Sequence, residues 1–139
     1  MITAEVVLRD RLRAAGFRKA RNRRWFIDQE GLWVELELQR SRYGGRSFIN
    51  IGLHLDDPHG GRDPDVYTRL DVWVDRDDVE DMLLDENPQL ERQLSALAED
   101  VIIPFVRTLT VPFMRSPQGH ELLGHAQISA EAARAFHYA

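Results

Sequence analysis

Apolar residues at helical spacing mark the first element of the chain. Leu8 and Leu12 are four residues apart, which places them on one face of a helix over residues 4–15. Thr3 precedes this run as an N-cap, and Gly16 follows it where a left-handed C-terminal residue belongs. We therefore expect an amphipathic N-terminal helix whose apolar stripe faces the core.

Alternation of apolar and polar residues then predicts strands. Glu30-Gly31 and Gly44-Gly45 are two-residue turn signals between the first three of them. If these pairs are the turns, Trp25 lies opposite Leu36, and Leu36 lies opposite Leu53. Both registers place apolar residues on one face of the sheet. The four predicted strands cover residues 23–29, 32–40, 46–56 and 67–75.

Helical patterns return after the last strand. Asn87-Pro88 starts the longest of them, because asparagine is a good N-cap and proline fits the first helical position. Pro104 should bend or interrupt this helix. The predicted helices cover residues 78–84, 88–109, a short run that begins at Ser116-Pro117 and ends at Gly124, and 130–138. The fold class is α+β: a four-stranded antiparallel meander, with an N-terminal helix and C-terminal helices packed on one face.

Length and composition narrow the class further. The chain has 139 residues, 43% hydrophobic and 29% charged, which indicates a globular protein with one hydrophobic core. We expect one domain over residues 1–139, with its core at 4–110 and a C-terminal helical extension at 111–139. No apolar run reaches the ~18 residues of a membrane span, and the first ten residues are not of signal-peptide type, so we expect a cytoplasmic protein. The absence of cysteine excludes disulfides and thiol nucleophiles.

Several of these positions resemble a bacterial family known only as domain of unknown function number 4304. The matching residues are Gly16-Phe17, Trp25-Phe26, Gln39, the run Phe48-Ile49-Asn50-Ile51-Gly52, and Arg69-Leu70, where Asp71 follows in place of an expected glycine. The likeness covers roughly residues 5–110. It implies a small cytosolic α+β domain with no reaction to carry over. Some small bacterial domains of this general kind are immunity proteins that bind toxins, which is an analogy only.

The polar face of the predicted sheet is the main candidate for function. In the predicted register Glu35 faces His54 and Gln39 faces Asn50. Aromatic side chains interleaved with polar ones are typical of recognition surfaces. The alternative is that residues 111–139 cover this face and make its tryptophans a second core. The candidate binding surface consists of Trp33, Glu35, Glu37, Asn50, His54, Tyr67, Arg69 and Trp73.

Charge is distributed unevenly along the chain. Residues 1–50 hold 11 basic and 6 acidic side chains, whereas residues 51–139 hold 7 and 17. All but one of the basic residues are arginine, which recognises carboxylates and phosphates in a bidentate manner. Arg40, Arg42 and Arg46 surround the second turn and are candidates for anion or RNA binding.

Motifs for catalysis are weak. Glu35, His54 and Asp56 could form a general-base pocket, but no nucleophile accompanies them, and we assign no catalytic residue. His120 and His125 are five residues apart, whereas a zinc-protease helix needs a spacing of four. We therefore expect no metal and no cofactor.

Three functions follow in order. The first is a non-catalytic binding module for a protein partner or a small molecule, with an immunity-type role as one version. The second is an enzyme that uses the Glu35, His54 and Asp56 pocket. The third is an RNA or anion binder that uses the arginine-rich tip, although nucleic acid is a poor match for a chain of net charge −5.

Overall fold

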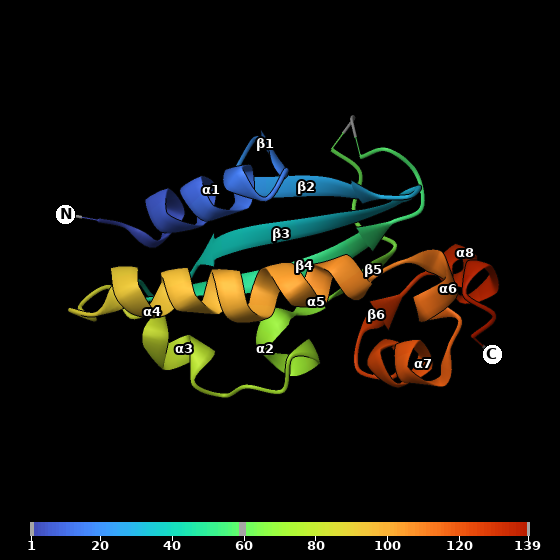
Figure 1. The fold of residues 1–139 in the computed structure, drawn as a ribbon. Helices are drawn as coiled ribbons and strands as arrows, with labels where there is room; N and C mark the ends of the chain where they lie inside the picture. The colour runs from blue at the N-terminus through green and yellow to red at the C-terminus, as the bar shows by residue number, and fades with distance from the viewer. Residues whose placement is uncertain (1, 59–60, 139) are drawn as a thin grey trace.

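The computed structural model describes residues 2–58 and 61–138 (Figure 1). An antiparallel sheet with strand order β1-β2-β3-β4-β5-β6 forms its centre. The α+β class is confirmed, but the described residues contain six strands instead of four. The strands are β1 (Arg18–Ala20), β2 (Arg24–Gln29), β3 (Leu32–Arg40), β4 (Ser47–His54), β5 (Val66–Arg69) and β6 (Gln127–Ile128).

The two additional strands lie at the edges of the sheet. β1 has three exposed residues, and β6 has only two residues. Neither is long enough to show the alternation that reveals a strand in a sequence. β1 arises because the basic segment after α1 folds back on β2, and β6 arises because the C-terminal segment returns to β5.

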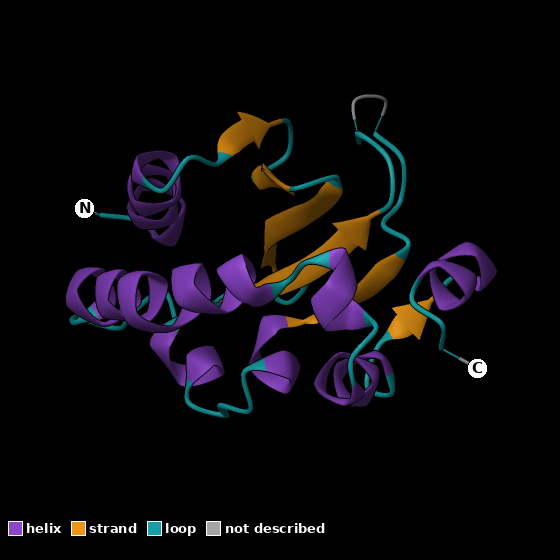
Figure 2. Cartoon of the chain, turned by 45° about the vertical axis from the view of Figure 1, so that its right-hand side comes forward, coloured by secondary structure: helices purple, strands orange, loops and turns teal. Residues whose placement is uncertain are grey.

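Helices gather on one side of the sheet and at one end of it. In Figures 1 and 2, α4 and α5 run as one rod across the sheet with α1 beside α4, and the last three helices lie next to β6. None of the helices in the described ranges has the length and apolar character needed to cross a bilayer. The helices are α1 (Ala4–Ala14), α2 (Leu70–Trp73), α3 (Val79–Met82), α4 (Leu90–Leu97), α5 (Ile103–Thr108), α6 (Val111–Met114), α7 (Pro117–Leu123) and α8 (Ala130–Ala135).

The N-terminal helix forms as its pattern predicts. The Thr3 hydroxyl accepts a hydrogen bond from the Val6 amide at 3.3 Å, and Gly16 has a φ of 98° just after the helix. Leu8 and Leu12 are buried against the sheet. Capping therefore limits the helix at both ends, and its apolar stripe holds it on the core.

The long helix contains the interruption expected at Pro104. Residues Ala98–Ile102 form a π-helical segment, η1, between α4 and α5, and the Ile103 amide donates to the carbonyl of Ala98. Proline has no amide hydrogen, and its ring would clash with the carbonyl four residues earlier. The wider π turn just before Pro104 accommodates that constraint without ending the helix.

The first predicted hairpin register is confirmed, and the second is wrong by two residues. Trp25 pairs with Leu36 as expected, but Leu36 pairs with Ile51 instead of Leu53. The connection between β3 and β4 is a six-residue loop closed by the Arg40–Ser47 pair, so Gly44-Gly45 does not form the centre of a tight hairpin. A shift of two preserves which face each side chain occupies, since side chains alternate with period two.

The fourth predicted strand ends early, which changes the role of Trp73. β5 stops at Arg69, and the chain turns into the short helix α2. Leu70 and Trp73, three residues apart, are buried there, whereas Val72 is 48% exposed. The indole nitrogen of Trp73 donates to the Leu122 carbonyl at 3.0 Å. Trp73 therefore belongs to the core, and its assignment to the binding surface is wrong.

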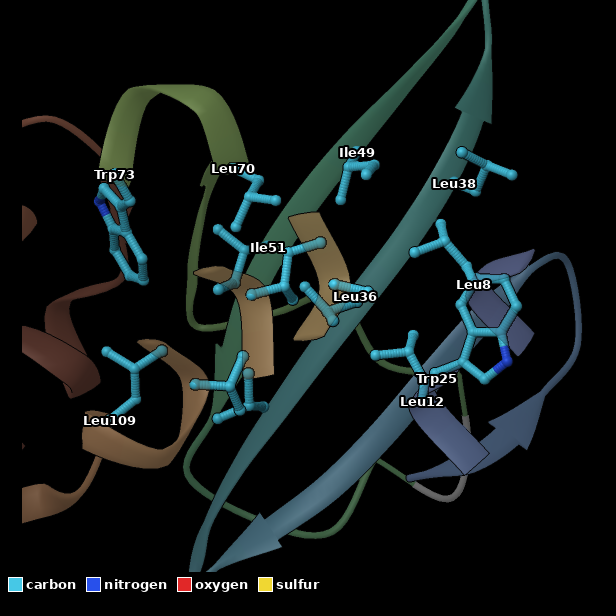
Figure 3. Close-up of a cluster of buried hydrophobic side chains, with 14 of the residues drawn as sticks. Leu8, Leu12, Trp25, Leu36, Leu38, Ile49, Ile51, Leu70, Trp73 and Leu109 are labelled. Atoms are coloured by element: carbon cyan, nitrogen blue, oxygen red, sulfur yellow. The ribbon is translucent and has the colours of Figure 1, made fainter. Parts of the chain in front are cut away.

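The C-terminal segment extends the main core instead of covering the polar sheet face. The Thr68 hydroxyl donates to the His125 carbonyl, and β6 continues the sheet beyond β5. Met114, Leu123 and Phe136 join the same buried cluster as the residues of α1 and the central strands. Figure 3 shows this cluster from Leu8 and Leu12 of α1, across Leu36 and Ile51, to Trp73 and Leu109.

The turn between β2 and β3 offers a test of local backbone strain. Glu30 and Gly31 both have positive φ, 55° and 96°. Asparagine tolerates this conformation better than glutamate does. We expect Glu30→Asn to raise the free energy of unfolding by about 0.5–1 kcal/mol, measured by urea denaturation with an unchanged slope. The control Glu30→Gln removes the same charge and should give no increase; equal effects from both variants would contradict the strain argument.

Candidate binding face

The sheet face away from α4 and α5 carries most of the predicted site residues. Alternation along β2, β3, β4 and β5 places polar and aromatic side chains there, while their neighbours point into the core. We call this surface the polar face. Its residues are Arg24, Phe26, Trp33, Glu35, Glu37, Gln39, Phe48, Asn50, His54, Tyr67 and Arg69.

Glu35 and His54 form a buried pair at the centre of the polar face. Glu35 Oε1 lies 2.9 Å from His54 Nε2, and the two side chains are 2% and 3% exposed. The backbone partner of Glu35 is Gly52, so the contact is diagonal and not the directly opposed pair that the sequence predicted. A Cβ at Gly52 would lie 2.8 Å from Pro64, which packs over the strand at this point.

Asn50 connects the next polar side chains into a network. Its amide nitrogen donates to Glu37 Oε1 at 3.0 Å and to Gln39 Oε1 at 2.8 Å. The other oxygen of Glu37 accepts a hydrogen bond from Arg24 Nε at 3.2 Å. Asn50 is buried, so the network fixes these side chains before any ligand arrives.

Tyr67 stands beside the two glutamates. Burial raises the pKa of its phenol above the ordinary 10.0, the charges of Glu37 and Glu35 raise it further, and Arg69 and Arg24 act in the opposite direction. Both glutamates sit close enough to influence this hydroxyl, so the middle of the polar face is acidic. Tyr67 is therefore a neutral hydrogen-bond donor at physiological pH.

Cations stack on the aromatic side chains at the two sides of the face. The guanidinium of Arg69 lies 3.7 Å from the centroid of Phe48 and also pairs with Glu80 at 3.4 Å. On the other side, the guanidinium of Arg18 lies 5.1 Å from the centroid of Trp33. Phe48, Trp33 and Tyr67 are half-buried, so part of each remains available to a ligand.

A cavity of about 850 Å³ borders the polar face at β1 and β2. Arg24 and Phe26 of β2 line it, and Phe26 packs edge-on against His54 with ring centroids 5.8 Å apart. We call it the cationic cavity. Its lining consists of Arg18, Lys19, Ala20, Arg21, Asn22, Arg24, Phe26, Asp57, Pro58, Gly61 and Asp63. The sequence shows the basic run 18–24, but the cavity needs the fold that brings residues 57–63 opposite it.

The Glu35, His54 and Asp56 pocket does not assemble. The side chain of Asp56 is 77% exposed and pairs with Arg62 at 3.7 Å, whereas Glu35 and His54 are shielded from solvent. Within the described ranges, no three histidine, aspartate or glutamate side chains are placed to hold a metal ion. Geometry thus favours holding a ligand over acid–base chemistry.

The arginine-rich tip is largely neutralised. Arg40 makes two hydrogen bonds to the carboxylate of Asp85, one of them at 2.8 Å, and this pairing lowers the pKa of Asp85. Arg46 pairs with Glu80 at 3.6 Å, and Arg42 lies over the ring of Tyr43. Two of the three anion-binding candidates are therefore already occupied by carboxylates.

The chain matches the family described as Domain of unknown function (DUF4304) over residues 8–107. It belongs to this family. The matched residues of this DUF4304 domain include β1–β5, and so the polar face and the cationic cavity, whereas β6 and the last three helices lie outside the match. No curated protein and no solved structure matches the chain.

The buried Glu35–His54 pair predicts a stability effect. We expect Glu35→Ala to lower the free energy of unfolding by about 2–4 kcal/mol, because it leaves His54 unpaired and opens a cavity. Glu35→Gln keeps an acceptor oxygen and should cost clearly less. Urea denaturation of the two variants measures the difference. A loss below about 0.5 kcal/mol in Glu35→Ala would show that the pair does not support the fold.

The environment of Tyr67 predicts its titration. One tyrosine should ionise above 10.0 and disappear from the ultraviolet tyrosinate titration in Tyr67→Phe. Glu37→Gln should lower the pKa of Tyr67 part of the way back, since burial remains, while the exposed Glu86→Gln should not. Because the folded pKa is raised, the stabilisation from this phenol is complete below the unfolded pKa and is lost as pH rises through the folded one. An unmoved pKa in Glu37→Gln would contradict this placement of the carboxylate.

Proposed function

We propose that this DUF4304 protein is a non-catalytic binding module whose polar face receives the ligand. The observation that carries the proposal is a fixed set of polar groups beside half-buried aromatics. Asn50 and Glu37 hold the network in place, and Trp33, Phe48 and Tyr67 supply apolar surface next to it. Such preorganisation reduces the entropy lost when a ligand binds.

Binding is favoured over catalysis by the state of the Glu35–His54 pair. A general base needs a position within hydrogen-bond distance of the proton it removes. Glu35 and His54 bind each other and are almost fully shielded, so neither is presented to a substrate. Their role in this proposal is to support Phe26 and the strands beneath the binding surface.

The cavity beside the polar face favours a small molecule as the ligand. Its volume of about 850 Å³ falls in the range of ligand sites, roughly 300–1,000 Å³. A protein partner, including an immunity-type partner, would instead cover the exposed parts of Trp33 and Tyr67 along the strands. The two versions differ in which residues a bound partner would shield from solvent.

A screen by amide NMR tests the proposal. Isotope-labelled full-length protein is titrated with a library of small metabolites, and each one that binds is analysed after incubation. We expect shifts at amides of β2, β3 and β4 on the polar face, with the compound recovered unchanged. Consumption of the compound would support the enzyme alternative and overturn the non-catalytic role.

Matched variants separate the polar face from other surfaces. Trp33→Leu should weaken binding at least about tenfold, because it removes aromatic surface from the site. Tyr43→Ala changes an aromatic that is 87% exposed at the distant hairpin tip and should leave binding unchanged. Equal losses in both variants, or shifts confined to α4 and α7, would contradict the assignment of the polar face.

A further inference from the structure

The cationic cavity carries more positive charge than its surroundings neutralise. Arg18, Arg21 and Arg24 line it from β1, the following turn and β2, and Asp57 and Asp63 line it from the other side. Arg24 is already paired with Glu37 at 3.2 Å. Among the described residues, no carboxylate lies within ion-pair distance of Arg18 or Arg21. These two arginines are the free cations of the cavity.

Arg18 is held in a fixed position without using its hydrogen-bond donors. Its guanidinium lies over the ring of Trp33, with 5.1 Å between the guanidinium carbon and the ring centroid. Stacking occupies the face of the guanidinium and leaves its in-plane N–H groups free for a carboxylate or phosphate. The stack also joins the cavity to the polar face, because Trp33 belongs to both surroundings.

The turn that carries Arg21 has an unusual backbone. Asn22 and Arg23 have φ of 61° and 59°, a left-handed conformation that costs an ordinary residue such as arginine about 1–2 kcal/mol. The Leu38 amide donates to the Arg23 carbonyl at 3.0 Å and fastens the turn to β3. Strain that is kept in place by the surrounding structure is common at binding sites. Here it holds a basic turn at the edge of the cavity.

We propose that the cationic cavity binds a small organic anion that carries a flat apolar group. Arg18 and Arg21 would bind its carboxylate or phosphate oxygens, and Phe26 would contact the flat part. This inference rests on the proposed function and adds the chemical class of the ligand. The acidic residues Asp57 and Asp63 on the other side disfavour a long polyanion such as RNA, as does the net charge of −5 of the chain.

Three simple probes test this chemistry on the full-length protein. Phenyl phosphate and benzoate combine a flat ring with an oxyanion, and benzamide is the neutral counterpart of benzoate. We expect both anions to shift the amides of residues 18–26 in NMR titrations, and benzamide to leave them unchanged. The tighter of the two anions identifies phosphate or carboxylate as the preferred group, and inorganic phosphate should bind more weakly than phenyl phosphate.

Exposed arginine variants identify the cations that bind the anion. Arg18→Gln combined with Arg21→Gln should weaken binding of the anions at least about tenfold, since each loses charge-assisted hydrogen bonds. Both side chains are exposed, so the fold should be unaffected. Arg134→Gln removes one charge from exposed α8 and should not change the affinity.

Each contrary result overturns a distinct part of the argument. Benzamide binding as tightly as benzoate, or an Arg18→Gln/Arg21→Gln variant of unchanged affinity, would remove the anion site. Single-stranded RNA that binds residues 18–26 more tightly than phenyl phosphate would replace the small anion with a nucleic acid. If other metabolites shift the polar face while these anions shift nothing, only this inference fails. If no compound shifts the polar face at all, the proposed function fails with it.

Discussion

Strand β3 is the constraint on which the rest of the structure depends. It is paired along its length with β2 and β4, so each of its side chains must face either the helices or the polar face. Leu36 and Leu38 enter the core, whereas Glu35 and Glu37 point to the other side. Because the side-chain period is two, one strand specifies both the hydrophobic core and the candidate binding face.

Burying glutamates on a sheet is costly unless their oxygens are satisfied. Here the cost is offset by specific partners: His54 for Glu35, and Asn50 with Arg24 for Glu37. The same hydrogen bonds make the polar face rigid. Charge that is not used in this network lies at the rim, at Arg18 and Arg21. The face therefore combines a fixed acidic centre with a cationic edge, which suits a ligand that is asymmetric in charge.

The C-terminal segment has a supporting role in this arrangement. It lies beyond the residues that match the DUF4304 family, yet Leu109 and Phe136 are fully buried in the main core. It also supplies the Leu122 carbonyl that accepts the Trp73 indole hydrogen bond. Its packing explains why Trp73 is part of the core, and it leaves the cationic cavity at the opposite edge of the sheet open to a ligand.

The sequence by itself determined the α+β class, the N-terminal helix and the division of strand residues between two faces. These features follow from local periodicity and capping, and they were enough to place Glu35, Asn50 and His54 on one face. Only the tertiary structure decided the register of β3 with β4, the end of β5 and the existence of β1 and β6. Turn lengths and edge pairings depend on contacts between distant segments, which leave no period in the sequence. The cationic cavity belongs to this second group, because it exists only where residues 18–26 and 57–63 meet.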